Sequence, residues 1–218
     1  VSVVERPVLN LPRILAGHEN YVVSVAFSPD GRWLATASLD NTARLWAWPG
    51  GALVSELRDH SNLVNMAAFS PDGALVATAS SDHDVRLWDG QSGQPLRVLT
   101  GHRGPVFAVA FTPSADRLVS AGSDQVLRFW DPKTGAQTAE VSGHSGNTNW
   151  LAFSPDGKLM VSTGSEGETW IRDGRSGAPL RLLRGHSARV NRAEFFVPPG
   201  AAPGELRVVT ASSDRSVR

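Results

Sequence analysis

Apolar and polar residues alternate over short stretches of this chain, and the stretches recur in a fixed order. The run VAFSPDG at 25–31 has counterparts at 67–73, 109–115 and 151–157, and each is an apolar alternation that ends in a proline-bearing turn. Alternation with a period of two places successive side chains on opposite faces of a strand, and Pro, Asp and Gly favour a tight turn after it. The pattern therefore predicts a repeated strand and turn.

Each of these strands is followed by further short apolar runs. A second run ends in a small residue and an acid, as in LATASLD at 34–40, with counterparts at 76–82, 118–124, 160–166 and 208–214. A third follows at once (TARLWA at 42–47, DVRLWD at 84–89, VLRFWD at 126–131), and a looser fourth completes the unit (PLRVLT at 95–100, PLRLLR at 179–184). Four short strands with Gly, Pro, Asp and Ser between them, and no helical period, predict an all-β repeat protein.

The repeat has a constant length with one exception. Five histidines lie forty-two residues apart, at His18, His60, His102, His144 and His186. In the fifth repeat the acid Asp214 follows Glu166 by forty-eight residues, so six residues are inserted between its first two strands. The insertion, at 196–205, is rich in Pro and Gly and predicts a surface loop. It is either a tolerated insertion or a loop that contacts a partner.

With Gly before four of the histidines and Trp-Asp after the third strand, the chain resembles the WD-repeat (WD40) β-propeller family. The resemblance covers essentially all of residues 1–218 as one domain or part of one. It implies that each repeat forms a four-stranded antiparallel blade and that the blades surround a central channel.

The family resemblance also implies a hydrogen-bond network of His, Ser or Thr, Asp and Trp within each blade. The first three repeats supply His18, Thr36, Asp40 and Trp46; His60, Thr78, Asp82 and Trp88; and His102, Ser120, Asp124 and Trp130. The fourth and fifth supply His144, Ser162 and Glu166, and His186, Thr210 and Asp214. The same residue types form nucleophilic triads, but their repetition beside a Trp that can cap the hydroxyl favours a structural network.

The fourth repeat departs from this pattern. It reads Trp170-Ile171-Arg172 where others read Arg-Leu-Trp, and Glu166 replaces the usual Asp. Residues two apart on a strand share a face, so the exchange keeps both side chains on one side of the blade. The change is either local decay of the repeat or an altered blade in which Arg172 pairs with Glu166.

Family propellers commonly bind peptides or proteins at the top face, around the channel mouth. The family positions that line this face give a ring with no acid and a single Arg, from which we select Tyr21, Leu63, Asn65, Phe107, Asn147, Asn149, Arg189 and Asn191. We expect a neutral or mildly acidic partner segment that hydrogen-bonds the asparagines. A solvated mouth without a ligand is the alternative.

Composition narrows the class of protein further. The 21 basic residues balance the 21 acidic ones, so the chain lacks the net positive charge that attracts nucleic acids and anionic membranes. Neither is therefore an expected partner. The absence of cysteine excludes disulfides and thiolate metal sites, and we expect no metal and no cofactor. No apolar run is long enough to span a bilayer and no signal peptide is recognisable, so we expect an intracellular, cytoplasmic protein.

The sequence thus predicts a non-catalytic scaffold for protein or peptide partners, part of a longer regulatory or signalling protein. The alternative is a propeller enzyme or small-ligand binder that uses the central channel, which would need acids, bases or metal ligands at its mouth.

The register of the repeats raises a question about the two ends. Residues 1–15 align with a third and fourth strand, and the chain ends where another third strand begins. The N-terminal strands would then complete the last blade and close a five-bladed ring. Alternatively, the chain is part of a larger propeller, since family members usually have about seven blades. We favour the larger propeller because Val4 stands at the Trp position.

Overall fold

The computed structural model describes residues 14–200 and 205–218, and these fold into strands and turns without a helix. Four antiparallel sheets of four strands and one of two strands follow one another along the chain, and each is termed a blade. Blades 1 and 2 contain β1 (Val22–Phe27), β2 (Trp33–Ser38), β3 (Ala43–Ala47) and β4 (Ala52–Leu57), then β5 (Val64–Phe69), β6 (Leu75–Ser80), β7 (Val85–Asp89) and β8 (Pro95–Leu99). Blades 3 and 4 contain β9 (Val106–Phe111), β10 (Leu118–Gly122), β11 (Val126–Trp130) and β12 (Gln137–Ser142), then β13 (Thr148–Phe153), β14 (Leu159–Gly164), β15 (Thr169–Asp173) and β16 (Pro179–Leu183).

Blade 5 contains β17 (Val190–Phe196) and β18 (Arg207–Ser212), with a bridge from Ala211 to Val217 that begins a third strand. The expected loop at 196–205 begins one residue later than predicted, because Phe196 still pairs with Arg207 in the sheet. Residues 201–204 lie outside the described residues. The all-β, four-stranded repeat predicted from the sequence is confirmed.

The turns between the first and second strands explain why the Ser-Pro-Asp-Gly run recurs. In blade 1, Ser28 donates its hydroxyl to Asp30 at 2.6 Å and accepts the amide of Trp33 at 2.9 Å, while Gly31 adopts a positive φ of 68°. The small polar side chains replace backbone partners in the turn, and glycine takes a conformation that other residues avoid. The same contacts recur at Ser70 and Ser154.

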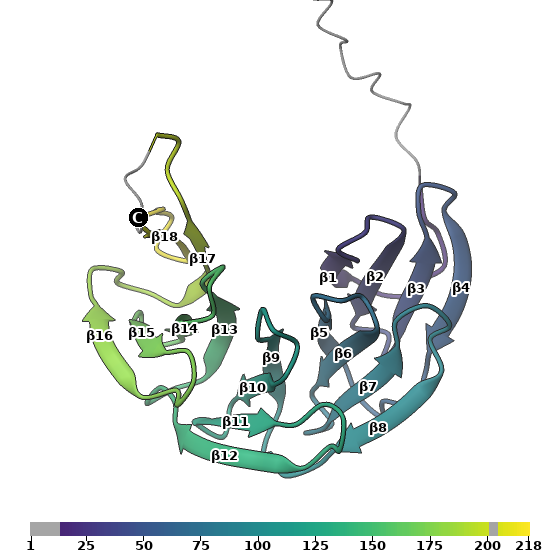
Figure 1. The fold of residues 1–218 in the computed structure, drawn as a ribbon, viewed down its shortest axis with the longest axis horizontal. Coiled ribbons are helices and arrows are strands. Elements are labelled where there is room, and N and C mark those ends of the chain that lie inside the picture. The colour runs from purple at the N-terminus through teal and green to yellow at the C-terminus, as the bar shows by residue number, and fades with distance from the viewer. Residues whose placement is uncertain (1–13, 201–204) are drawn as a thin grey trace, which may run out of the picture.

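The blades stand side by side along an arc (Figure 1), with the first strand of each on the inside and the fourth on the outside. Successive inner strands contact one another from β1 through β17. The arc is open between β1 and blade 5 (Figure 1), so the described residues do not form the closed five-bladed ring considered above. Most of the N-terminal segment that would close it, residues 1–13, lies outside the described residues.

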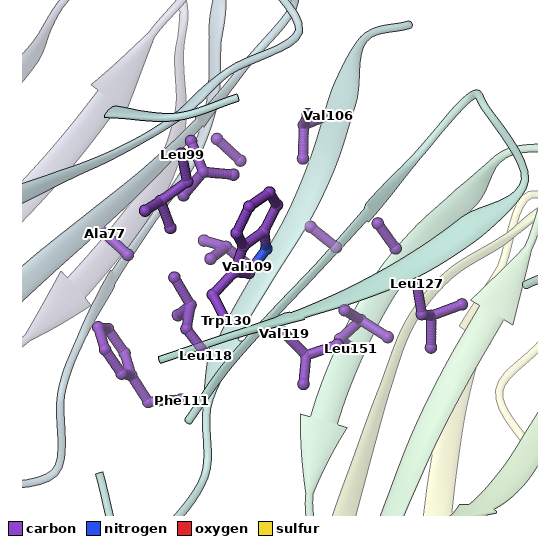
Figure 2. Close-up of a cluster of buried hydrophobic side chains, with 14 of the residues drawn as sticks. Ala77, Leu99, Val106, Val109, Phe111, Leu118, Val119, Leu127, Trp130 and Leu151 are labelled. Carbon is purple, nitrogen blue, oxygen red and sulfur yellow. The ribbon is translucent and has the colours of Figure 1, made fainter. Parts of the chain in front are cut away.

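The core lies between neighbouring blades. Figure 2 shows Ala77 and Leu99 of blade 2 on one side of Trp130 in blade 3, and Leu151 of blade 4 belongs to the same buried cluster. Because a single four-stranded sheet has two faces, each blade must bury both against its neighbours, and small residues such as Ala77 leave room for the indole. This packing holds the polar network of each blade in place.

Candidate functional site

Blade 2 contains the expected network in full. The His60 imidazole contacts Asp82 through Nδ1 at 2.7 Å and Thr78 through Nε2 at 2.7 Å, and the Trp88 indole donates to the Thr78 hydroxyl at 2.9 Å. Blades 1 and 3 repeat this arrangement with contacts between 2.7 and 3.0 Å, among His18, Thr36, Asp40 and Trp46 and among His102, Ser120, Asp124 and Trp130. In blade 5, His186 lies 2.8 Å from both Asp214 and Thr210.

The electrostatics of this network favour a neutral imidazole. Burial lowers the pKa of His60 and of His102, against the opposing effect of Asp82 and Asp124. A neutral ring can donate from Nδ1 to the carboxylate and accept at Nε2 from the hydroxyl, whose oxygen in turn accepts the indole N–H. Burial raises the pKa of Asp82, but hydrogen bonds from His60 and from backbone amides outweigh it and hold that pKa below its usual range.

The hydroxyls of the network do not face solvent. Thr78 and Ser120 are fully buried, and each hydroxyl oxygen contacts both an indole N–H and an imidazole nitrogen. A nucleophile must reach its substrate, so these groups act as bridges between strands rather than as catalytic triads.

Blade 4 builds the network with a different donor. Arg172 donates from Nε to the Ser162 hydroxyl at 2.8 Å, in the place where the other blades use an indole. Ser162 contacts His144 at 3.0 Å, and His144 contacts Glu166 through Nδ1. Arg172 makes no ion pair with Glu166, so that pairing, considered from the sequence, is wrong: the guanidinium is turned toward Ser162 and toward backbone carbonyls.

The structure gives the top-face asparagines a role between blades. Asn65 donates its amide to Ser81 and to the carbonyl of Val106 in the next blade at 2.8 Å. Asn149 does the same with the carbonyl of Val190 at 3.2 Å and accepts two hydrogen bonds from Arg189. These amides therefore join blade 2 to blade 3 and blade 4 to blade 5.

The remaining top-face residues differ in exposure. Tyr21 is 78% exposed, and Asn191 and Arg189 are also exposed, while Leu63, Phe107 and Asn147 are half-buried. Asn191 donates to Ser213 at 3.1 Å. The surfaces that remain free for a partner are thus chiefly aromatic and polar.

A cavity of about 250 Å³ faces the inside of the arc, where a channel ligand would sit. It is lined by residues 22–25 of β1 and by Trp150 and Arg192, whose guanidinium lies 4.4 Å from the centre of the indole ring. Arg192 is the one charged residue in this lining and there is no carboxylate, so the cavity does not gather the acids and bases that catalysis in the channel would require.

Three potential metal ligands meet in blade 4, at a place where the sequence gave no reason to expect them. Ligand atoms of His144, Glu166 and Glu168 lie within 4.8 Å of one another. His144 contacts Glu166, and Glu168 pairs with Arg184 at 3.3 Å. Each of these residues therefore already has a partner within the protein.

The repeat and the four-stranded blades agree with a comparison against protein families. The model of the WD domain, G-beta repeat, matches residues 9–47, 51–89, 93–131 and 135–172, which is more than half of the chain. The chain belongs to the WD-repeat family. Its blades are thus those of a WD-repeat β-propeller, and four of the blades in the described residues have all four strands.

Curated relatives share single stretches of this WD-repeat chain. WD repeat-containing protein 36 of Homo sapiens is 39% identical over 54 residues, which is 25% of this chain and 6% of the relative. U3 small nucleolar RNA-associated protein 21 homolog of Schizosaccharomyces pombe is 42% identical over 57 residues, or 26% and 6%. Notchless protein homolog of Arabidopsis thaliana is 48% identical over 44 residues, or 20% and 9%. The matched segments thus cover only a small part of each relative.

Some residues that matter in these sites carry no distinctive signal in the sequence. Thr42 donates to Asp40 at 2.6 Å and Ser216 to Asp214 at 2.7 Å, so each adds a donor to the network. Both stand two residues after the acid, at a repeat position where the other repeats have different residue types, which hides their common role.

No helix in the described part of the chain could cross a membrane.

Proposed function

We propose that this chain is a non-catalytic scaffold that presents the top face and rim of its blades to protein or peptide partners, as part of a longer regulatory or signalling protein. The observation that carries the proposal is the contrast between a rigid interior, joined by hydrogen bonds between blades, and a top face on which Tyr21, Arg189 and Asn191 are exposed and Phe107 is half-buried. Membership of the WD-repeat family supports it, because such domains are typically interaction scaffolds.

The rigidity matters for binding because a pre-formed surface loses little conformational entropy when a partner docks. Asn65 and Asn149 fix the angle between adjacent blades beneath that surface. The top-face residues supply two aromatic rings, an amide and one cation, which suit a peptide main chain and an uncharged or acidic side chain.

Two relatives have names that refer to RNA or ribosomes: the U3 small nucleolar RNA-associated protein 21 homolog of Schizosaccharomyces pombe, and Ribosome assembly protein 4 of Saccharomyces cerevisiae. We propose a protein partner for this chain rather than RNA, because its 21 basic and 21 acidic residues leave no net positive charge. The intracellular, cytoplasmic location expected from the sequence stays a prediction.

The test is affinity capture from cell extract with the wild-type chain and with Tyr21→Ala/Phe107→Ala, before and after ribonuclease treatment. We expect defined proteins to be enriched with the wild-type chain, to survive ribonuclease and to fall about tenfold with the double variant, since two aromatic contacts contribute that much or more. Leu96→Ala, at an exposed position on the outer strand β8, serves as the matched control and should capture as the wild type does.

Equal capture by the wild type and the top-face variant would reject this surface as the binding site. Partners that vanish with ribonuclease would instead identify RNA as the bound component.

A further inference from the structure

A cleft of about 580 Å³ opens between blade 3 and blade 4. The outer strand β12 of blade 3 supplies Glu140, Val141 and Ser142, and blade 4 supplies most of the other walls, including Trp170, Arg172, Ala178 and Pro179. We refer to it as the blade 3–4 cleft. It lies away from the top face, and none of the top-face residues selected from the sequence lines it.

Blade 2 has a cleft at corresponding positions, and the two differ in size. The blade 2 cleft measures about 270 Å³ and is lined by Asp59, Arg86, Trp88 and Pro95, which stand two repeat lengths before Gly143, Trp170, Arg172 and Pro179. In blade 2, Arg86 faces Asp59 at 3.8 Å and the indole of Trp88 is buried. In blade 4 the Arg and Trp are exchanged and Gly143 replaces the acid at this position, so Glu140 is the one carboxylate in the lining, and the cleft has the larger volume.

Arg172 is a buried cation without an acidic partner at contact distance. Its side chain is 1% exposed, and no carboxylate of the described residues lies within 4.0 Å of its guanidinium. Nε donates to Ser162, Nη1 to the carbonyls of Ser142 and Gly177, and Nη2 to the carbonyl of Gly143. A guanidinium has five N–H donors, so one on Nη2 has no protein acceptor.

A buried charge is costly unless an opposite charge accompanies it. The nearest acid of the network, Glu166, is reached only through Ser162 and His144. Glu140, at the rim of the cleft, is already held by Arg128 at 3.2 Å. A carboxylate from outside the chain would therefore supply the opposite charge that the Arg172 guanidinium lacks at the floor of the cleft.

The walls add a second requirement. The indole of Trp170 is half-buried, with the Arg172 guanidinium 6.0 Å from its ring centre, and Val141, Ala178 and Pro179 add apolar surface beside it. The Ser142 side chain is exposed at the edge, where its hydroxyl can donate to an anion. The cleft thus combines an apolar surface with a cationic floor.

We propose that the blade 3–4 cleft binds an acidic segment of a partner protein, in which an Asp or Glu carboxylate faces Arg172 and Ser142 and an adjacent apolar side chain packs on Trp170. The inference rests on the proposed scaffold function and names one binding site and the chemistry of its partner. The exchange of Trp and Arg in blade 4 is then a change that serves binding rather than decay of the repeat.

The experiment is a titration of the whole chain, with its Trp indoles labelled with ¹⁵N, by the peptide acetyl-Ala-Leu-Glu-Ala-amide and by its Gln counterpart. The Trp170→Phe variant assigns the Trp170 indole signal. We expect the Glu peptide to shift that signal and to bind about tenfold more tightly than the Gln peptide, because hydrogen bonds to a charged acceptor are the stronger ones.

Variants of the cleft sharpen the test. Ser142→Glu introduces a negative charge at an exposed position and should weaken binding of the Glu peptide about tenfold by like-charge repulsion. Trp170→Arg/Arg172→Trp, which rebuilds the arrangement of blade 2, should abolish the shift. Leu96→Ala, in the blade 2 cleft, is the matched control and should bind as the wild type does.

Equal affinities for the two peptides, no shift of Trp170 at millimolar peptide, or unchanged binding by Ser142→Glu would each overturn the proposal. Tyr21→Ala/Phe107→Ala should leave the peptide titration unchanged, because those residues do not line the cleft. Failure of the cleft and failure of the top face are therefore separate results.

Discussion

Blades 3 and 4 have the same strand order and nearly the same register, yet different side chains donate to the buried serine of their polar networks. In blade 3, Ser120 pairs with Val109 and Arg128, and in blade 4 the equivalent Ser162 pairs with Leu151 and Trp170. The hydroxyl receives an indole N–H in blade 3, at 2.8 Å, and a guanidinium N–H in blade 4, also at 2.8 Å. The network therefore requires a donor at this place but not a particular side chain.

Blade 4 also differs from blade 3 in its buried hydroxyls. Thr148, Thr163 and Thr169 are buried there without a hydrogen-bond partner for their hydroxyls. Blade 3 has Val106, Ala121 and Leu127 at the same positions. An unpaired buried hydroxyl costs free energy, so blade 4 is expected to be the less stable of the two blades.

The largest expected effect comes from the indole of blade 3. Trp130→Ala should lower the free energy of unfolding by about 3–5 kcal/mol, because it removes a 2% exposed ring from the cluster in Figure 2 and takes a donor from Ser120. Urea denaturation measures the change. Trp130→Phe separates the two causes: it keeps most of the volume and should cost about 1 kcal/mol for the lost hydrogen bond. Equal costs for both variants would mean that packing contributes little.

A smaller effect, of opposite sign, is expected in blade 4. Thr148→Val replaces a fully buried, unpaired hydroxyl with a methyl group of similar size and should raise the free energy of unfolding by about 1 kcal/mol. Val106→Thr is the matched change in blade 3 and should lower it by a similar amount. A loss of stability on Thr148→Val would show that the hydroxyl has a partner after all.

The smallest effect concerns pH. Burial lowers the pKa of His102 in the folded chain, so the unfolded chain binds a proton more readily. Stability should then be at its full value above about pH 6.5 and should fall as the pH drops through that value toward the folded pKa. Urea midpoints at pH 7.5 and 5.5 measure the fall, which His102→Gln should reduce. The same pH dependence in variant and parent would exclude His102 as its source.

The sequence anticipated most of the fold because its signals are local and repeated. Alternating apolar residues define the strands, and Ser28, Asp30 and Gly31 close a turn by contacts within a few residues of one another. The family resemblance also implied the network of His60, Thr78, Asp82 and Trp88, whose His column recurs in all five repeats and whose Trp column recurs in the first three. A local feature that recurs in successive repeats can be predicted without knowing how the neighbouring blades pack.

The interactions between blades were not accessible in this way. The top-face asparagines look alike in the sequence, but Asn149 is buried and holds the backbone of blade 5, whereas Asn191 is exposed. The carbonyls that Asn65 and Asn149 contact lie in the next blade, about one repeat away along the chain. The direction of the Arg172 side chain was likewise not predictable. From the sequence it could pair with Glu166, but in the structure its guanidinium points toward Ser162 and carbonyl oxygens.

The sequence by itself thus determined the strands and the turns, because these depend on nearby residues and on the forty-two-residue period. Only the tertiary structure decided burial. Val25 is 65% exposed on β1, while its equivalent Val109 on β9 is fully buried, because blade 2 packs against β9. Equivalent residues have the same local structure, but their exposure depends on what the neighbouring blade places against them.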